Sequence, residues 1–172
     1  MKFIQLFSNI MKPNQILTKN LQKYNIDWMN KYKGTANTVL FPKNTEEVSK
    51  IMTICNDEKI PIHIQGGNTG LVGGSISTQS YVLMNMSKMD QIQNFCNKTG
   101  IIHCEAGCIL QNLEEYADNN GWTIPLDLGA KGTCQIGGNI ATNAGGTRFF
   151  KYGSLHENIV GIKAILPNGE VY

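Results

Sequence analysis

The sequence predicts an α+β fold in which a small parallel βαβ lobe comes first and a second lobe with a different pattern follows. Residues 38–64 contain two short apolar runs separated by an amphipathic stretch, as in a strand–helix–strand unit. After Met89 the pattern changes, and a strand and a helix lead into a long glycine-rich stretch. Five of the 18 glycines lie within 65–74 and six within 127–146, which indicates close backbone approach at two places.

The first lobe begins with a strand at 38–41, which Pro42 ends. Asn44 is placed to cap the next helix, and Glu47 three residues later completes a variant capping box. Apolar residues at i, i+3, i+4 and i+7 predict that this amphipathic helix covers 45–58. Further strands are expected at 60–64 and 81–84.

The second lobe is predicted to contain a strand at 100–105 and a helix at 109–119 that Gly121 ends. The apolar run 159–166 predicts another strand, and Pro-Asn-Gly at 167–169 is a strong turn signal. The residues that the helix is expected to bury are Leu110, Leu113, Tyr116 and Ala117.

We expect an N-terminal extension, 1–27, and one domain, 28–172, whose lobes cover about 28–89 and 90–172. The chain is long enough for one domain with a real core. A strand returning from the turn at 167–169 would have about three residues, too few to pair stably. The sequence therefore indicates a domain that is incomplete at its C-terminus; the alternative is a complete small protein with an edge hairpin.

The composition argues against two classes of partner. An apolar fraction of 41% and a charged fraction of 16% are typical of an ordinary globular protein. A formal net charge of +2, without a patch rich in lysine and arginine, predicts no nucleic-acid surface. No apolar run approaches the roughly 20 residues of a membrane span.

The first 26 residues contain four lysines and no acidic residue, and six apolar residues within 3–11 could share a helix face. An acid-poor amphipathic start is typical of a mitochondrial presequence, although such segments are normally rich in arginine. We expect mitochondrial targeting. The alternatives are a short, locally packed N-terminal helix and a cytoplasmic protein.

The five cysteines, an odd number without a secretory signal, favour reduced thiols inside a cell. The spacing of His103, Cys104 and Cys108 could suggest a metal site. However, Cys104 falls in an apparent strand, Cys108 opens a helix, and no second pair of ligands follows. We predict no metal and interpret these thiols as buried and unpaired.

The glycine stretches match neither of two familiar phosphate loops. No G-x-G triplet occurs, which excludes the dinucleotide fingerprint, and no Gly-Lys pair occurs, which excludes a Walker loop. The glycines come instead as doublets, at 66–67, 73–74, 137–138 and 145–146. Because successive backbone N–H groups can form anion-binding concavities, we expect a phosphate-bearing cofactor to contact both stretches.

Three motifs together resemble one family. Residues 61–70 read PIHIQGGNTG, 125–132 read PLDLGAKG and 136–146 read IGGNIATNAGG. They resemble the FAD domain of the D-2-hydroxyglutarate dehydrogenase and D-lactate dehydrogenase group, within the vanillyl-alcohol oxidase superfamily and its PCMH-type FAD-binding fold. The likeness runs from about Tyr24 to Tyr172. It implies a small parallel α/β lobe, then an α+β lobe with a mainly antiparallel sheet, and FAD between them.

The resemblance implies that the first glycine segment, residues 65–74, wraps the FAD pyrophosphate. Asn68 stands where several covalent flavoproteins of the superfamily carry a flavin-linked histidine. An amide cannot make that bond, so FAD is expected to be non-covalent. The residues matched to this segment's role are Gly66, Gly67, Asn68, Thr69 and Gly70, with Gly73 and Gly74 shaping the turn.

By the same resemblance, the second glycine segment, residues 127–146 together with Leu126, lines the isoalloxazine and ribityl side of FAD. Lys131 and Arg148 could stabilise reduced flavin by their charge; the alternative is that both are solvated surface cations. His63 and His156 are assigned no role, and Asp127 is interpreted as fixing the loop. The matched residues are Leu126, Asp127, Gly129, Ala130, Gly132, Thr133, Gly137, Gly138, Asn139, Thr142, Ala144 and Gly145, with Ile162 contacting FAD through its backbone.

The family implies an oxidoreductase, an FAD-dependent D-2-hydroxy-acid dehydrogenase. The implied substrate is D-2-hydroxyglutarate, oxidised to 2-oxoglutarate by hydride transfer to FAD, with electrons leaving to electron-transferring flavoprotein or a similar acceptor. In relatives the substrate- and metal-binding residues lie in a later domain, so no catalytic residue and no metal ligand is named. The alternatives are an inactive FAD-binding fragment, a D-lactate or glycolate dehydrogenase, and a cell-wall reductase or alkylglycerone-phosphate synthase. The run at 127–132 favours the hydroxy-acid group.

Overall fold

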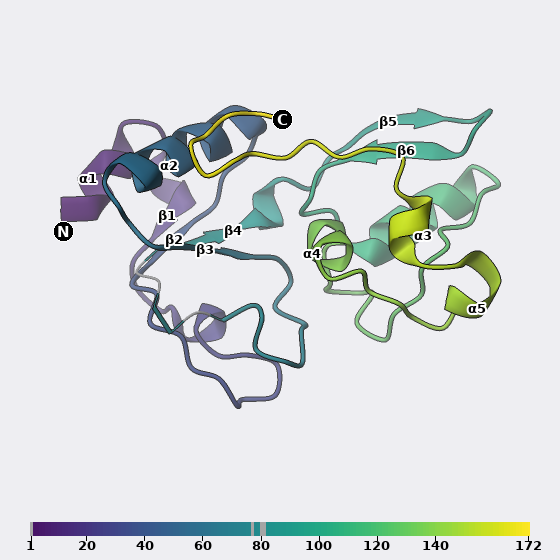
Figure 1. Cartoon of the computed structure of the whole chain (residues 1–172), viewed down its shortest axis with the longest axis horizontal. Helices are drawn as coiled ribbons and strands as arrows, with labels where there is room; N and C mark the ends of the chain where they lie inside the picture. Colours follow the sequence, from purple (N-terminus) through teal and green to yellow (C-terminus); the bar gives the residue numbers. More distant parts are fainter. Residues whose placement is uncertain (1, 77, 80–81) are drawn as a thin grey trace. The chain divides into compact units, whose positions relative to one another are not determined.

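The computed structural model describes residues 2–76, 78–79 and 82–172, which fall into two compact units (Figure 1). Unit 1 comprises Met1–Lys88 and Lys163–Tyr172, and unit 2 comprises Met89–Ile162. Unit 1 contains a four-stranded mixed sheet and unit 2 a two-stranded antiparallel sheet. The predicted α+β class is confirmed.

The sheet of unit 1 has the strand order β1-β2-β4-β3. Strands β2 (Thr38–Leu40) and β3 (Ile62–Gln65) both pair in parallel with β4 (Val82–Asn85), and β1 (Ile16–Leu17) is antiparallel to β2. Every residue of β4 is buried, which makes it the centre of this core. The predicted parallel unit is therefore confirmed, with β4 between its two strands. Tyr81, where the sequence predicts the start of β4, lies outside the described residues.

Helix α2 (Thr45–Asp57) forms where the sequence predicts it. The Asn44 side chain accepts a hydrogen bond from the backbone N–H of Glu47 at 2.8 Å, as expected of the N-cap. The Glu47 carboxylate accepts from the backbone N–H of Lys43 at 2.8 Å. The box thus closes one residue earlier than the usual capping box. The buried residues of α2 are Val48, Ile51 and Cys55.

The C-terminal turn packs against α2 within unit 1. The hydroxyls of Ser49 and Thr53 donate to the carbonyls of Gly169 and Asn168. The predicted turn at 167–169 is confirmed, since Gly169 has a φ of 86° and closes a hairpin-like reversal.

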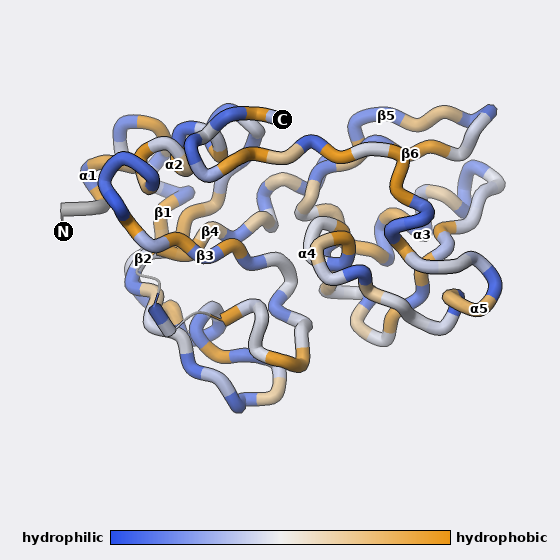
Figure 2. The backbone as a smooth tube through the Cα atoms, in the orientation of Figure 1, coloured by the Kyte–Doolittle hydropathy of each residue, from blue (hydrophilic) through white to orange (hydrophobic). Residues whose placement is uncertain are grey.

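The strand predicted at 159–166 is wrong. Its residues are largely hydrophobic (orange in Figure 2), but within the described residues the segment forms only an isolated bridge, between Ile165 and Val171. Val160 and Ile162 are 78% and 66% exposed. An apolar run with high β propensity becomes a strand only where a neighbouring strand accepts its hydrogen bonds.

Unit 2 begins with the antiparallel pair β5 (Ile92–Cys96) and β6 (Ile101–Cys104). β6 was predicted and β5 was not. Helix α3 (Leu110–Asn119) is confirmed, and Gly121, with a φ of 76°, follows its end. Leu110, Leu113 and Ala117 are buried as expected, but Tyr116 is 36% exposed and stacks edge-on against Phe95. The prediction for Tyr116 is therefore wrong, because β5 gives this ring a partner at the surface.

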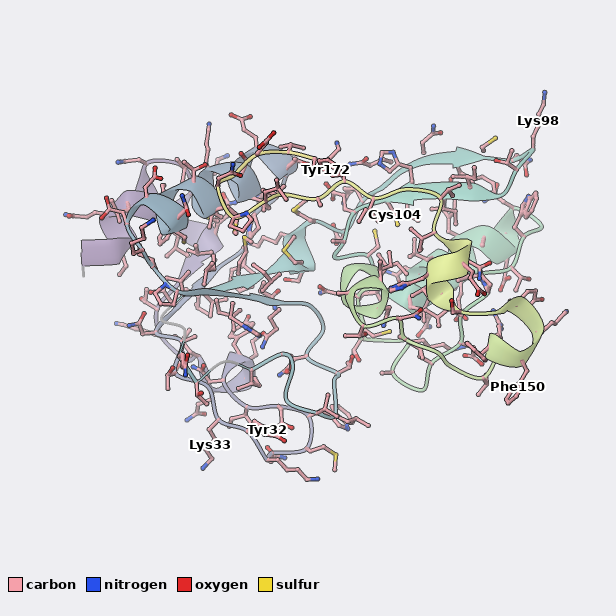
Figure 3. All side chains as sticks on the ribbon, in the orientation of Figure 1. Tyr32, Lys33, Lys98, Cys104, Phe150 and Tyr172 are labelled. Carbon is pink, nitrogen blue, oxygen red and sulfur yellow. The ribbon has the colours of Figure 1, made fainter. Side chains whose placement is uncertain are left out.

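The remaining helices are short. At the N-terminus, α1 (Lys2–Ser8) is followed by Met11, and Phe7 is fully buried while Met11 is 5% exposed. This is the locally packed helix that the sequence allowed. On α5 (Phe149–Tyr152), Phe150 is 99% exposed (Figure 3). The described residues also form α4 (Ile136–Ala141) and the 3₁₀ helices Pro13–Gln15, Gln22–Tyr24, Met86–Lys88 and Leu155–Asn158.

Candidate functional site

The first glycine segment continues directly from β3 and is held at its base by two buried amides. The Gln65 side chain, 1% exposed, donates to the carbonyls of Tyr24 and Ser75, both at 3.0 Å. The Asn85 side chain donates to the carbonyl of Gly66 at 3.3 Å. Because these donors lie on neighbouring strands, the sheet itself sets the start of the loop and its return.

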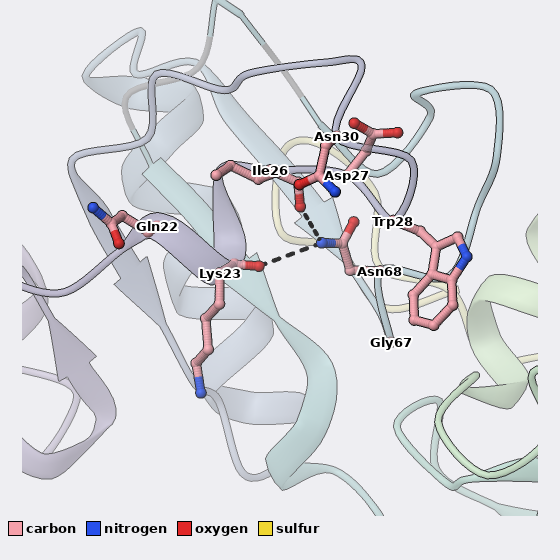
Figure 4. A pocket seen from close by; sticks show the side chains of 8 residues that line it. All are labelled: Gln22, Lys23, Ile26, Asp27, Trp28, Asn30, Gly67 and Asn68. Carbon is pink, nitrogen blue, oxygen red and sulfur yellow. Dashed lines mark hydrogen bonds between the residues drawn. The ribbon is translucent and has the colours of Figure 1, made fainter.

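Asn68 clamps this loop to the segment between β1 and β2 (Figure 4). Its side-chain amide donates to the carbonyls of Ile26 at 2.7 Å and Lys23 at 3.3 Å. Its amide oxygen accepts from the Ser75 hydroxyl at 2.6 Å. Asn68 also has a φ of 55°, a conformation that asparagine tolerates better than most residues. The side chain is therefore committed to the loop, and only the backbone of Asn68 can serve a ligand.

A pocket of about 420 Å³ lies beside this clamp (Figure 4). Gly67 and Asn68 line one part of it, and the stretch 22–30 lines the rest, with Trp28 67% exposed. The Asp27 carboxylate accepts from the backbone N–H of Tyr32 at 2.7 Å, and this bond above all lowers its pKa. Sequence reasoning gave 24–28 no role beyond the start of the family likeness, because nothing local shows that this stretch folds onto the glycine loop.

The two ends of the second glycine segment are hydrogen-bonded to each other. The backbone N–H of Thr147 donates to the carbonyl of Asp127 at 3.2 Å, and the Thr147 hydroxyl donates to the Asp127 carboxylate at 3.1 Å. Gly146, with a φ of 76°, lies so close that a Cβ there would be 2.2 Å from the carbonyl oxygen of Asp127. The interpretation of Asp127 as a loop-fixing carboxylate agrees with these contacts.

Helix α4 lies inside this segment and was not predicted, because paired glycines weaken a helix. Its first N–H groups, of Ile136 and Gly137, donate to the carbonyls of Cys108 and Ala106 at 2.9 and 2.8 Å. These groups are therefore not free to bind an anion. A Cβ on Gly137 would lie 2.7 Å from the Cβ of Ala106, so glycine is required here by packing.

Among the described glycines, five others in the two segments are not required by the chain itself, and Gly161 outside the segments is equally unobstructed. A Cβ on any of them would meet no atom within 4 Å, and none has a positive φ. Glycine is then unfavourable for folding, since it loses more conformational entropy than alanine. Its remaining physical use is to leave backbone open to something outside the chain. These open glycines are Gly70 and Gly74 in the first segment and Gly129, Gly138 and Gly145 in the second.

Two predicted site residues have inward-facing side chains. Leu126 is 1% exposed and packs in a core with Leu110, Cys134 and Leu155. Asn139 is 7% exposed, and its side-chain oxygen has no hydrogen-bond partner. Gln135 is equally buried with an unpaired oxygen, and sequence reasoning passed over it. The remaining predicted residues are partly or fully exposed: Gly66, Gly67, Thr69, Gly73, Ala130, Gly132, Thr133, Thr142, Ala144 and Ile162.

The five cysteines are free thiols. The Cys108 thiol hydrogen-bonds to the sulfur of Cys104, which lowers the pKa of Cys104 and raises that of Cys108. Cys108 is buried as expected, whereas Cys104 is half-buried. Burial raises the pKa of Cys55 to about 11. Across residues 2–76, 78–79 and 82–172, no three His, Cys, Asp or Glu side chains form a group that could hold a metal ion.

The Asp127 contacts predict a dependence of stability on pH. The Thr147 hydroxyl, opposed by burial and helped by the charges of Lys131 and Arg148, lowers the pKa of Asp127 below its ordinary 3.8. A carboxyl with a lowered pKa stabilises the fold above 3.8 and loses this contribution as the pH falls through its folded value. We expect the free energy of unfolding of unit 2 to fall below about pH 4. The Asp127→Asn variant should show less of this slope.

Urea titrations between about pH 3 and pH 5 in a Trp28→Phe background, followed by the fluorescence of Trp122, measure this slope. Asp118→Asn, on the exposed part of α3, is the matched control. Equal slopes in wild type, Asp127→Asn and Asp118→Asn would contradict the role of Asp127.

A family model described as "FAD binding domain" matches residues 36–172. The chain is 54% identical over 147 residues to a protein of Oryza sativa subsp. indica named "Probable D-2-hydroxyglutarate dehydrogenase, mitochondrial", covering 86% of this chain and 26% of that protein. It is 46% identical over 172 residues to the mitochondrial D-2-hydroxyglutarate dehydrogenase of Arabidopsis thaliana, covering 99% and 31%. The chain thus spans about a third or less of the length of these curated relatives.

Solved structures share the fold. Alkyldihydroxyacetonephosphate synthase matches with a TM-score of 0.89 at 18% identity, over 99% of this chain and 34% of that one. The grass pollen allergen Phl p 4, described as having glucose dehydrogenase activity, matches with a TM-score of 0.83 at 17% identity, over 99% and 37%. At these identities the likeness shows the fold alone. Among the described residues, no helix is long and apolar enough to cross a membrane.

Proposed function

This chain belongs to the family of FAD binding domains, and from that premise we propose that it is the FAD-binding part of a flavin-dependent D-2-hydroxy-acid dehydrogenase. The observation that carries the proposal is the set of open glycines, which occur in both glycine segments. They leave main chain exposed where a planar ring or a phosphate has to touch it. We further propose that the FAD-binding domain covers residues 28–172 and that 1–27 precede it.

Each segment has a proposed role. The first binds the pyrophosphate through the backbone of Gly66 to Gly70. This role is consistent with the Asn68 side chain being hydrogen-bonded to Ile26 and Ser75, which leaves only its backbone for a ligand. The second receives the isoalloxazine and ribityl part against Gly129, Gly138 and Gly145, while the side chain of Leu126 supports it from the core. When bound, FAD supplies the two-electron acceptor for oxidation of a 2-hydroxy acid.

The first test is a visible absorption spectrum of the 172-residue protein after reconstitution with FAD and desalting. We expect structured flavin absorption to remain with the protein. Denaturation should then release all of it, because Asn68 offers no nucleophile for a covalent link. Loss of the flavin from a folded chain would contradict the proposed cofactor, and flavin that stays attached after denaturation would contradict non-covalent binding.

A second test uses Gly138, the open one of the two adjacent glycines of α4. Gly138→Ala should raise the stability of unit 2 by up to about 1 kcal/mol, because alanine is the better helix former and its methyl meets no atom. The same methyl should weaken FAD binding by about tenfold, a loss of about 1.4 kcal/mol, because it stands where the ring must approach backbone. Fluorescence titration of FAD and urea denaturation measure the two effects.

Ala141→Gly, at the exposed end of the same helix, is the control. It should lower stability by up to about 1 kcal/mol and leave FAD affinity unchanged. If affinity merely followed helix stability, Gly138→Ala would bind FAD more tightly and Ala141→Gly less tightly. That pattern would contradict the proposed contact.

D-2-Hydroxyglutarate is the proposed substrate and 2-oxoglutarate the product, and the names of the curated relatives support this substrate. The proposed electron acceptor is electron-transferring flavoprotein or a similar carrier. Their names also support a mitochondrial location. Replacing the matching N-terminal part of the Arabidopsis thaliana relative with this chain tests whether it serves a complete enzyme. We expect dye-coupled turnover of D-2-hydroxyglutarate to persist in the chimera and to fall when Gly138 is replaced by alanine. A folded chimera without flavin would contradict the assignment.

A further inference from the structure

An acidic residue outside both glycine segments contacts the second one. Glu114 lies on α3, one position after the core residue Leu113, and is 7% exposed. Its carboxylate lies 3.1 Å from the ammonium of Lys131 and 3.6 Å from the guanidinium of Arg148. One of its oxygens has no hydrogen-bond partner and depends on the nearby charge of Arg148. Because a buried carboxylate is costly unless it is paired, the burial of Glu114 requires these two cations to stay beside it.

The two cations lie at different parts of the second segment. Lys131 is in its first turn and also contacts the Asp127 carboxylate at 3.5 Å. Arg148 follows the segment's last residues and donates to the carbonyl of Ile124, just before the segment begins. Among the ion pairs and hydrogen bonds of the described residues, Glu114 is therefore the one residue on α3 that contacts both cations.

The backbone of α3 adds to this attachment. The N–H of Gln111 donates to the carbonyl of Lys131 at 3.0 Å, and the N–H of Leu110 donates to the carbonyl of Cys134 at 3.2 Å. Both bonds hold the stretch 131–134. Neither reaches Arg148, so the polar link from α3 to Arg148 depends on Glu114.

We propose that Glu114 is a positioning residue for the cofactor. It holds Lys131 and Arg148, and through them both ends of the second glycine segment, in the arrangement that leaves the open glycines accessible. The two cations face two carboxylates, of Glu114 and Asp127, so they are committed to the segment rather than free to act on a ligand. This inference rests on the proposed function.

Neighbouring Glu115 provides a matched control. It lies on the same helix, is exposed, and its carboxylate accepts from the side-chain amide of Gln111. Glu114→Gln and Glu115→Gln remove the same charge and keep the side-chain shape. A difference between them therefore reports the ion pairs of Glu114 and not net charge or helix propensity.

Hydrogen exchange of the cofactor-free protein is the first measurement. In Glu114→Gln we expect several-fold faster exchange of the amides of Lys131, Thr133 and Thr147, with no change in the β5–β6 pair. Glu115→Gln should match wild type. Lys131→Met, which removes both ion pairs of a partly exposed side chain but leaves Glu114 paired with Arg148, should give a smaller change in the same direction and serves if Glu114→Gln fails to fold.

FAD affinity is the second measurement. It is made in about 1 M salt, where the Debye length is about 3 Å, so the change in net charge has little effect on FAD binding. We expect a several-fold weaker affinity in Glu114→Gln alone. Identical exchange and affinity in the two glutamine variants would overturn the proposal. Exchange that accelerates equally in β5–β6 would also overturn it, because it would show general destabilisation of unit 2.

The proposed function and this inference can fail separately. If the wild-type chain retains no FAD after desalting, the proposed function fails. The exchange comparison is made without cofactor and still decides whether Glu114 orders the segment.

Discussion

Gly146→Ala should destabilise unit 2 by about 3 kcal/mol or more, which is a large share of the stability of a typical small domain. The φ of 76° at Gly146 costs an alanine about 1 to 2 kcal/mol. The new Cβ would also lie 2.2 Å from the carbonyl oxygen of Asp127, which is backbone and cannot rotate away. The contact that closes the second segment should therefore open, and FAD affinity should fall with it.

The chain offers a way to measure this in one unit. It has two tryptophans, Trp28 in unit 1 and Trp122 in unit 2. In a Trp28→Phe background, urea denaturation followed by fluorescence reports unit 2. Gly145→Ala is the control, because a Cβ at Gly145 meets no atom within 4 Å. Equal midpoints for the two alanine variants would contradict the tight closure at Gly146.

Asn68→Ala should destabilise unit 1 by about 3 kcal/mol. Two of the three side-chain hydrogen bonds, to Ile26 and from Ser75, are short, and each contributes about 1 kcal/mol. Alanine also tolerates the φ of 55° less well than asparagine, at a cost of about 1 kcal/mol. We expect the segment between β1 and β2 to detach from the glycine loop and the proposed pyrophosphate site to lose its shape.

Asn68→Gly separates the two causes, since glycine adopts this φ freely. It should recover roughly 1 kcal/mol relative to alanine but not the hydrogen bonds. Urea denaturation, followed by the fluorescence of Trp28 in a Trp122→Phe background, measures the free energy of unfolding of both variants. Asn56→Ala, on the exposed face of α2, is the control and should be nearly neutral. A full recovery in Asn68→Gly would show that the clamp contributes little.

Local signals explain the elements that could be predicted. Helix α2 was predicted with its first residue because Asn44 caps it and its apolar residues follow a helical period. Helix α3 was predicted for the same kind of reason. The run 159–166 has equally strong local propensity but no partner strand in the described residues, and α4 forms despite its paired glycines because α4 is attached to 106–108. Partners distant in sequence decided both cases.

The sequence by itself determined the family and its cofactor class, and it predicted two glycine segments as the site, because these inferences depend on motifs of adjacent residues. It could not separate the glycines that packing requires, such as Gly137 and Gly146, from open ones such as Gly138. It also could not show that Asn68 clamps its loop or that Glu114 reaches the second segment. Only the tertiary structure decided these points, because each depends on a contact between residues far apart along the chain.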